Sequence, residues 1–228
     1  MNMHHIIITG ASRGIGHATA LLYASMGWNI SICSRHCDYQ MTQTQDAITA
    51  AGGQYFSFCG DMGNAADAEE FLAKAVRTFG TPEILVNNAG ISHIGLLQDM
   101  TPMRWDDIIR TNLSSVFYTS RVIIPYFLQE KHGRIINVSS VWGSVGASTE
   151  VAYSTTKGGI NAFTKALAKE LAPSGIPVNA VACGMIDTSM NSFLDPEELA
   201  AVIDEIPAGR AGTPQEAAAL IRQVAEAP

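Results

Sequence analysis

The sequence predicts one α/β domain built on a doubly wound parallel sheet, spanning residues 1–228. Three observations support this fold class. Short apolar runs alternate with segments of helical periodicity along almost the whole chain. A glycine-rich turn joins the first apolar run to the first helical segment, and polar residues follow several later runs. The length suits a single domain, and no repeat or low-complexity linker divides it.

The composition is that of a folded soluble protein, with 47% hydrophobic and 15% charged residues. The net charge of −7 argues against unspecific binding to nucleic acid. No apolar stretch reaches the length of a membrane span or a signal-peptide core. The cysteines show neither C-x-x-C spacing nor a histidine cluster, so we expect reduced thiols, no metal site and a cytoplasmic location. These cysteines are Cys33, Cys37, Cys59 and Cys183.

In the first half of the chain, each expected strand is followed by a helix. The first strand, Met3 to Thr9, ends at the glycine-rich turn, and Ile15 to Met26 then shows helical spacing. Asn64 is placed to cap a helix that runs to Phe79 with an apolar inner face. The remaining expected elements are the strands Trp28 to Ser34, Gln54 to Cys59 and Glu83 to Asn87, and the polar helix Tyr39 to Ala51.

The second half continues the alternation. Thr101 and Pro102 suit the N-cap and the first position of a helix within the segment Met100 to Arg110. A long helix is expected from Asn112 to about Lys131, where Gly133 stops it. The last expected elements are the strand that begins at Arg134 and carries Ser140, the helix from Tyr153 to about Leu171, and the strand Ile176 to Ala182.

This alternation predicts right-handed crossovers and a parallel sheet with helices on both faces. The order expected for such a doubly wound sheet is 3-2-1-4-5-6. The carboxyl ends of parallel strands meet at one edge, where ligands bind in such folds. Gly10, Gly14 and Gly16 follow a strand and open a helix, so their backbone is placed to approach a pyrophosphate. Their spacing is G-x-x-x-G-x-G, which differs from the G-x-G-x-x-G fingerprint. The alternative for these glycines is a plain tight turn.

A second group combines Tyr153, Lys157 and Ser140. Tyr153 and Lys157 are one helical turn apart, so the phenol and the ammonium can reach the same volume. A nearby ammonium favours the phenolate, and we therefore expect it to lower the pKa of Tyr153. Ser140 follows a buried strand and is expected at its carboxyl end. Taken alone, the Tyr-x-x-x-Lys pair would also fit a surface pair.

The end of the second strand bears on cofactor choice. An acid placed there binds the ribose 2′-hydroxyl of NAD(H), but the residues here are Ser34, Arg35 and His36. Arg35 and Arg13 can instead bracket a 2′-phosphate through charge-assisted hydrogen bonds. NADP(H) is therefore favoured over NAD(H). The alternative is that Arg35 is a solvated charge at a strand end.

Together these motifs resemble the short-chain dehydrogenase/reductase family over about Ile6 to Ala217. Within it, the sequence looks most similar to the bacterial reductases of 3-oxoacyl groups on acyl carrier protein. The motifs that carry the resemblance are Thr9-Gly10-Ala11-Ser12-Arg13-Gly14-Ile15-Gly16, Asn87-Asn88-Ala89-Gly90, Asn112, Ser140, and Tyr153 with Lys157.

The resemblance implies a Rossmann-like fold and a role for each of four residues. Tyr153 would give a proton to a carbonyl oxygen that Ser140 holds, while the nicotinamide supplies hydride. Lys157 would bind the nicotinamide ribose, and Asn112 would anchor a proton-relay water, although Asn112 also reads as a helix N-cap. The implied cofactor contacts are Gly10, Ser12, Arg13, Gly14, Ile15, Gly16, Ser34, Arg35, Asp61, Met62, Asn88, Ala89, Gly90, Tyr153, Lys157, Gly184, Ile186 and Thr188. Asp61 and the 88–90 segment could also be turn formers only.

The carboxyl-terminal part departs from the family pattern. Cys183-Gly184 stands where Pro-Gly is usual, which loosens that turn. Residues 185–210 are expected to form a substrate lid, with an ordinary surface helix as the alternative. The family's seventh strand is absent before the last residue, Pro228, so either a tail is omitted or the protein is truncated.

The function implied by the resemblance is NADPH-dependent reduction of 3-oxoacyl groups on acyl carrier protein in fatty acid synthesis. Two alternatives stay open, namely another small ketone or alcohol substrate, and a non-catalytic NADP-sensing protein. We expect a homotetramer or homodimer, without nucleic-acid or membrane partners, formed through the helices 112–131 and 153–171. The apolar side chains proposed for that interface are Phe117, Ile124, Phe163 and Leu167. Lys131 is expected as a basic contact for the acidic carrier at the mouth of the site.

Overall fold

The computed structural model describes residues 4–227 as a six-stranded, fully parallel sheet with helices on both faces. The strand order is β3-β2-β1-β4-β5-β6, which confirms the predicted order 3-2-1-4-5-6. Met3, where the first strand was predicted to begin, lies outside the described residues. The strands are β1 His5–Thr9, β2 Asn29–Ser34, β3 Gln54–Cys59, β4 Ile84–Asn87, β5 Arg134–Ser140 and β6 Val178–Cys183.

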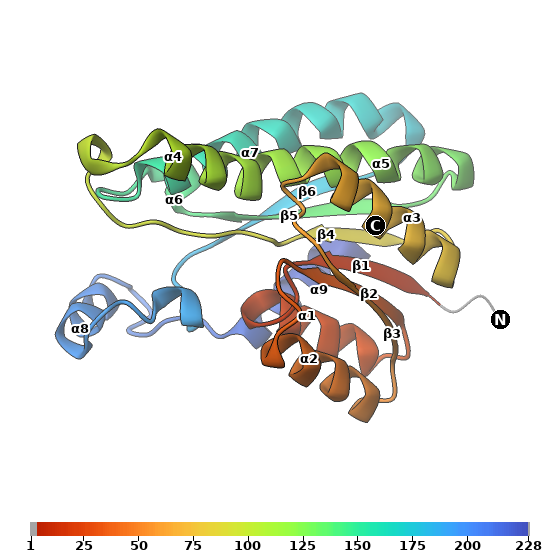
Figure 1. Ribbon diagram of the computed structural model, residues 1–228, viewed down its shortest axis with the longest axis horizontal. Helices are drawn as coiled ribbons and strands as arrows, with labels where there is room; N and C mark the ends of the chain where they lie inside the picture. Colours follow the sequence, from red (N-terminus) through yellow and green to blue (C-terminus); the bar gives the residue numbers. More distant parts are fainter. Residues whose placement is uncertain (1–3, 228) are drawn as a thin grey trace.

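The helices divide between the two faces of the sheet, with α1, α2 and α9 on one face and α3, α5 and α7 on the other (Figure 1). Two of the predicted caps are confirmed, because Asn64 accepts from Ala66 N and Asp67 N, and Thr101 accepts from Arg104 N. The helices are α1 Gly14–Ala24, α2 Tyr39–Ala50, α3 Ala65–Phe79, α4 Pro102–Ile109, α5 Ser115–Glu130, α6 Trp142–Val145, α7 Val151–Leu171, α8 Pro196–Asp204 and α9 Pro214–Glu226.

The core consists of two apolar layers, one on each face of the sheet. Ile6, Ile7 and Ile8 of β1 are all fully buried, so this central strand is apolar on both faces, as parallel strands between helices usually are. Tyr23 of α1 packs in the first layer, and Phe127 of α5 in the second. This packing fixes the strands and leaves the loops at their carboxyl ends to form a site.

The path from α4 to α5 differs from the prediction. The expected single helix from Asn112 to Lys131 instead begins within a π-helical turn, Arg110–Ser114, and α5 follows it. Such wide turns occur often at functional sites, because they displace a side chain from the regular helical spacing. Asn112 is therefore inside a continuous helical stretch and is not an N-cap.

Two expectations about the surface need correction. Leu167 is buried in the core and cannot serve a subunit interface, whereas Phe117 is 48% exposed. Ile124 and Phe163 are partly buried against the core. Lys131 lies at the opposite edge of the sheet from Ser140, because it ends α5 just before β5 begins. It is therefore absent from the mouth of the site.

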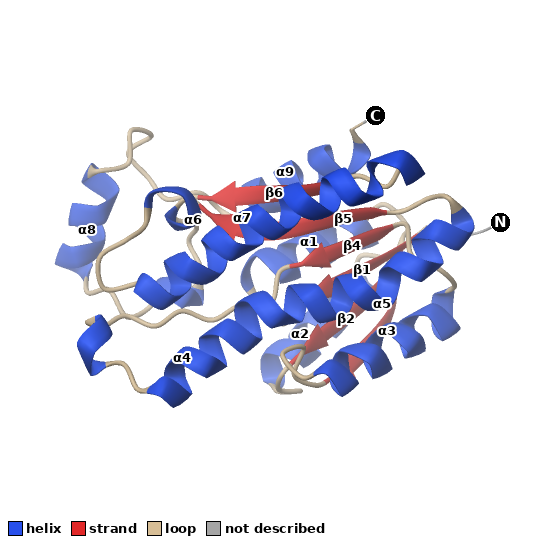
Figure 2. Ribbon diagram, turned by 90° about the horizontal axis from the view of Figure 1, so that it is seen from above, coloured by secondary structure: helices blue, strands red, loops and turns tan. Residues whose placement is uncertain are grey.

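The strands are parallel, so their carboxyl ends lie at one edge of the sheet, and α4, α6 and the α8 region lie beyond the arrowheads there (Figure 2). The start of β1 and the end of α9 lie toward the opposite edge. The segments after β1, β4, β5 and β6 therefore meet at the edge where a ligand would bind. In the described part of the chain, we find no helix long and apolar enough to cross a membrane.

Candidate active site

The glycine-rich turn after β1 is tightly packed against the segment after β4. Gly10 and Gly14 have φ values of 65° and 58°, which favour glycine. A Cβ on Gly10 would lie 2.7 Å from Ala89 Cα, and one on Gly16 would lie 2.5 Å from the Gly10 carbonyl oxygen. The turn therefore needs glycine at these positions, and its shape follows from the close approach of two strand ends.

Asn88 stabilises this turn through hydrogen bonds from its side chain. Its side-chain amide donates to the carbonyl oxygens of Thr9 and Gly10, both at 2.9 Å, and the Thr9 hydroxyl accepts from the backbone N–H groups of Asn88 and Ala89. Asn88 was predicted to contact the cofactor. In the structure its side chain shapes the turn, and the cofactor contact stays a prediction.

The segment after β6 reaches the same turn. A Cβ on Gly14 would lie 3.3 Å from Thr188 Cγ2, so Thr188 flanks the start of α1. Ile186 pairs with Gly212 in an isolated parallel bridge, which anchors the start of the 185–210 segment. No protein atom lies within 4 Å of the Cβ position of Gly184, so the backbone there is open. A cavity of about 580 Å³ lies within this segment, lined by residues that include Thr188, Leu194, Leu199 and Ile203.

Ser140, Tyr153 and Lys157 meet beyond the carboxyl end of β5. Ser140 is the last residue of the strand and is buried, while Tyr153 and Lys157 lie on the first two turns of α7. The Ser140 hydroxyl hydrogen-bonds Tyr153 and also accepts from Trp142 N at 3.2 Å. The Lys157 ammonium lies 5.4 Å from the centroid of the Tyr153 ring. The structure thus brings the three residues together, as the sequence predicted.

The pKa values in this cluster contradict one prediction made from the sequence. Burial, with a smaller contribution from Glu150, raises the pKa of Tyr153 to about 12, and the Ser140 hydrogen bond only partly offsets this. Burial also lowers the pKa of Lys157 to about 8. The predicted lowering of the Tyr153 pKa is therefore wrong for this structure. Lys157 Nζ donates to the Val138 carbonyl oxygen at 2.8 Å, so its charge is directed toward that carbonyl.

Asn112 joins the cluster from the π-helical turn. It is fully buried, its Oδ1 accepts from Ile91 N at 2.8 Å, and its Nδ2 donates to the Ile91 carbonyl oxygen and to Thr156 Oγ1. A Cβ on Gly90 would lie 3.5 Å from Asn112 Oδ1 and 3.8 Å from Lys157 Nζ. Gly90 therefore lies between the two side chains, and Asn112 ties the segment after β4 to α7.

Arg35, the residue after β2, belongs to an ionic network that the sequence did not predict. Its guanidinium lies 3.5 Å from carboxylate oxygens of Asp61 and Asp107, and it also donates to Thr111 Oγ1. Arg110 bonds the same two carboxylates, at 2.5 and 3.0 Å. Arg35 is thus only partly exposed and has defined partners, which argues against the solvated-charge alternative.

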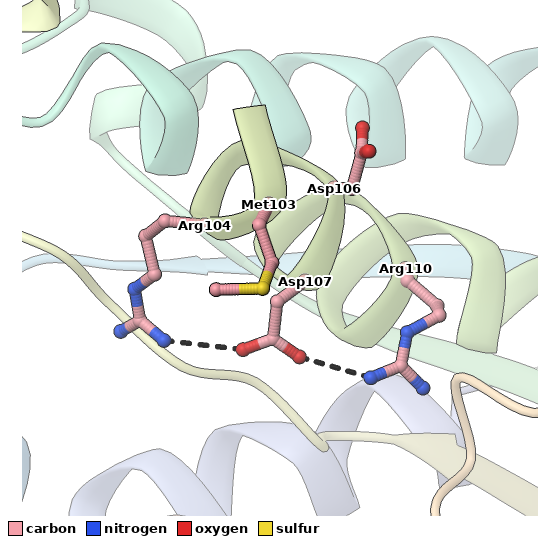
Figure 3. A pocket seen from close by; sticks show the side chains of 5 residues that line it. All are labelled: Met103, Arg104, Asp106, Asp107 and Arg110. Atoms are coloured by element: carbon pink, nitrogen blue, oxygen red, sulfur yellow. Dashed lines mark hydrogen bonds and ion pairs between the residues drawn. The ribbon is translucent and has the colours of Figure 1, made fainter. Parts of the chain in front are cut away.

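The α4 side of this network surrounds a surface pocket of about 640 Å³ (Figure 3). Asp107 lies between Arg104 and Arg110 and pairs with both. Burial opposes ionisation of Asp61, but the hydrogen bond from Arg110 and the charge of Arg35 bring its pKa below the usual value. The helical spacing of Arg104, Asp107 and Arg110 was a signal that could have pointed to this network.

The remaining predicted contacts lie close by, with different roles for their side chains. Met62 is buried in the core, so its side chain cannot face a ligand. Arg13 is exposed and donates to Gln40 Oε1 at 3.0 Å. The Ser34 hydroxyl donates to the His36 carbonyl oxygen, and the Ser12 carbonyl oxygen accepts from Thr44 Oγ1. Ile15 packs partly against the core.

Comparison with known proteins agrees with this geometry. The family model described as short chain dehydrogenase matches residues 4–199. The chain is 39% identical over 212 residues to the 3-oxoacyl-[acyl-carrier-protein] reductase FabG of Escherichia coli K12, covering 93% of this chain and 85% of that protein. It is 37% identical over 222 residues to the 3-oxoacyl-[acyl-carrier-protein] reductase of a Synechocystis strain, covering 97% and 89%.

A solved structure gives the same result at the level of the fold. The crystal structure of levodione reductase superposes with a TM-score of 0.93 at 26% sequence identity, covering 98% of this chain and 90% of that one. The glycine turn, the Ser140 cluster, the family match and these relatives lead to one conclusion. The chain belongs to the short chain dehydrogenase family and is an oxidoreductase that acts on CH–OH groups.

Proposed function

We propose that this protein is an NADPH-dependent ketone reductase that acts on 3-oxoacyl groups carried on acyl carrier protein, as in fatty acid synthesis. The observation that carries the proposal is the joining of Ser140, Tyr153 and Lys157 beyond the end of β5, on the sheet edge that also bears the glycine turn. The names of the curated relatives supply the substrate class.

The residues present fit a dinucleotide. Helix α1 has no side-chain hydrogen bond at its N-cap and no acidic residue in its first turn. Its first N–H groups are therefore available to an anion, and the helix dipole favours one there. Gly10 and Gly14 adopt left-handed backbone conformations at this turn, which lets the main chain approach a pyrophosphate. Thr188, whose Cγ2 faces Gly14, supplies a hydroxyl that can donate a hydrogen bond to the cofactor.

Arg35 supports NADPH as the cofactor. It follows β2 at the position where an acid would bind the ribose of NADH, and Arg13 lies across the turn. A 2′-phosphate would compete with Asp61 and Asp107 for the Arg35 guanidinium. Because Arg110 also binds both carboxylates, their negative charge is already partly compensated when Arg35 turns to a phosphate.

The chemistry follows from the protonation states of the cluster. NADPH supplies a hydride when bound. With its pKa near 12, Tyr153 keeps its proton at neutral pH and can give it to a carbonyl oxygen as negative charge develops there. Ser140 is positioned to donate to the same oxygen. The Lys157 ammonium, with its pKa near 8, can pass a proton toward the tyrosine and become the neutral amine.

Exposed apolar side chains near this edge suit an acyl chain. They lie on the loop after β4, on α6 and in the segment that precedes α8. Their exposure means that a substrate tail could cover apolar surface without first displacing a packed core. The side chains are Ile94, Leu96, Leu97, Trp142, Val145, Met190 and Phe193.

The test is the loss of NADPH absorbance with 3-oxoacyl groups on acyl carrier protein and with a short free 3-oxoacyl thioester. We expect both to be reduced, with the carrier-bound substrate at the higher kcat/KM. The second candidate, suggested by the levodione reductase match, is reduction of levodione or another small ketone. Turnover of a ketone panel without turnover of 3-oxoacyl thioesters would favour that candidate. NADPH binding without any turnover would favour a sensing protein.

A further inference from the structure

Two exposed cysteines lie side by side at the ends of β2 and β3. Cys59 is the last residue of β3 and is the register partner of Ser34, the last residue of β2. After Ser34 the chain turns back, since the Ser34 hydroxyl donates to the His36 carbonyl oxygen and Gly60 N donates to the Ser34 carbonyl oxygen. This turn brings Cys37 beside Cys59, because Cys59 Sγ contacts the carbonyl oxygen of Arg35, two residues before Cys37, and the two thiols influence one another.

The same turn carries Arg35. Cys59 Sγ donates to the Arg35 carbonyl oxygen at 3.8 Å, so this thiol contacts the backbone of the proposed 2′-phosphate residue. Both thiols are free and exposed, whereas Cys33 is buried. Accessible thiols that face one another are the sites at which reversible disulfides form.

We propose that Cys37 and Cys59 form a reversible disulfide that controls binding of the 2′-phosphate end of the cofactor. Formation of the disulfide does not depend on the proposed function, whereas its effect on the cofactor rests on the proposed use of NADPH. In the disulfide, Cys59 has no S–H to donate to Arg35, and Cys37 is tethered to β3. The turn that orients Arg35 is then held in a different shape.

Formation of the disulfide needs a two-electron oxidant, and a peroxide can serve as one. The Cys59 thiolate attacks a peroxide oxygen, the O–O bond breaks, and a sulfenic acid and hydroxide form. The Cys37 sulfur then attacks the sulfenic sulfur, the S–O bond breaks, and its proton leaves with the departing oxygen as water. Two thiols lose two electrons, and the peroxide is reduced to water.

The experiment treats the purified full chain with hydrogen peroxide, blocks the remaining thiols, and maps disulfides by mass spectrometry before and after dithiothreitol. We expect a Cys37 to Cys59 cross-linked peptide that dithiothreitol removes and that Cys37→Ser and Cys59→Ser each abolish. The buried Cys33 is the internal control and should be alkylated only after unfolding. Linkage of Cys33 to Cys37, cross-linking between chains, or no disulfide would each overturn the proposal.

The second measurement is the Kd of NADPH and of NADH, by titration of protein fluorescence, for reduced and oxidised protein. We expect oxidation to weaken NADPH binding at least about tenfold and NADH binding much less, because only NADPH has the phosphate that Arg35 would bind. The two serine variants should show no response to peroxide. A disulfide that leaves NADPH binding unchanged would overturn the regulatory role. Failure of the reduced protein to bind either nucleotide would instead count against the proposed function and leave the disulfide result standing.

Discussion

Replacing Lys157 by methionine should make the protein more stable while removing its activity. Lys157 is only 4% exposed, and its pKa is lowered from 10.5 to about 8 by burial. Below pH 8 the folded protein must therefore hold a charged amine in a site that disfavours the charge. Methionine has a similar length and carries no charge, so it removes this cost.

The size of the stability gain follows from the linkage between the pKa shift of Lys157 and the free energy of unfolding. A shift from 10.5 to about 8 corresponds to about 3 kcal/mol at 1.36 kcal/mol per pH unit. The variant also loses the bond from Lys157 Nζ to the Val138 carbonyl oxygen, which costs about 1 kcal/mol. The net gain at pH 7 is about 2 kcal/mol, or roughly 4–8 °C in Tm for a chain of this size.

The pH dependence gives the sharper test. The folded pKa lies below the unfolded pKa, so the penalty is fully present below pH 8 and disappears as the pH rises toward 10.5. The advantage of Lys157→Met should therefore shrink over that window. Urea unfolding at pH 7 and pH 10 measures it, and Lys165→Met, at an exposed position on α7, is the matched control. A variant less stable than wild type at pH 7, or an unchanged difference at pH 10, would refute the reasoning.

Three further outcomes are expected. Tyr153→Phe should keep NADPH binding, since the ring still packs, and lose about 10²–10⁴-fold in kcat, since the transferable proton is gone. Near-normal turnover would show that Tyr153 is not the proton donor. Arg35→Ala should erase most of a preference for NADPH over NADH of about tenfold, whereas equal losses for both nucleotides in titrations would show that Arg35 does not bind the phosphate. Gly16→Ala should abolish binding of both nucleotides or prevent folding, because its Cβ would lie 2.5 Å from the Gly10 carbonyl oxygen. Tight nucleotide binding by folded Gly16→Ala protein would contradict the close packing of the turn.

The sheet order, most elements and the Ser140 cluster could be predicted because each depends on local patterns. Strand periodicity, glycines at a turn and the one-turn spacing of Tyr153 and Lys157 are all visible within short segments. The network around Arg35 could not be predicted in the same way. Its partner Asp61 comes from the loop after β3 and Asp107 from α4, and only the fold brings them together. The hydrogen-bond partners of Asn112 in the π-helical turn, Ile91 and Thr156, likewise come from distant segments.

The pKa of Tyr153 shows why chemistry is harder to predict than position. The spacing predicted a nearby ammonium correctly, but the pKa also depends on burial, which no local pattern gives. Burial opposes the charged form of each side chain, so it raises the pKa of Tyr153 and lowers that of Lys157. Both shifts favour neutral forms, and a neutral phenol is a proton donor. The cluster as folded is therefore better suited to protonating a carbonyl oxygen than to removing a proton from an alcohol, which agrees with reduction as the proposed direction.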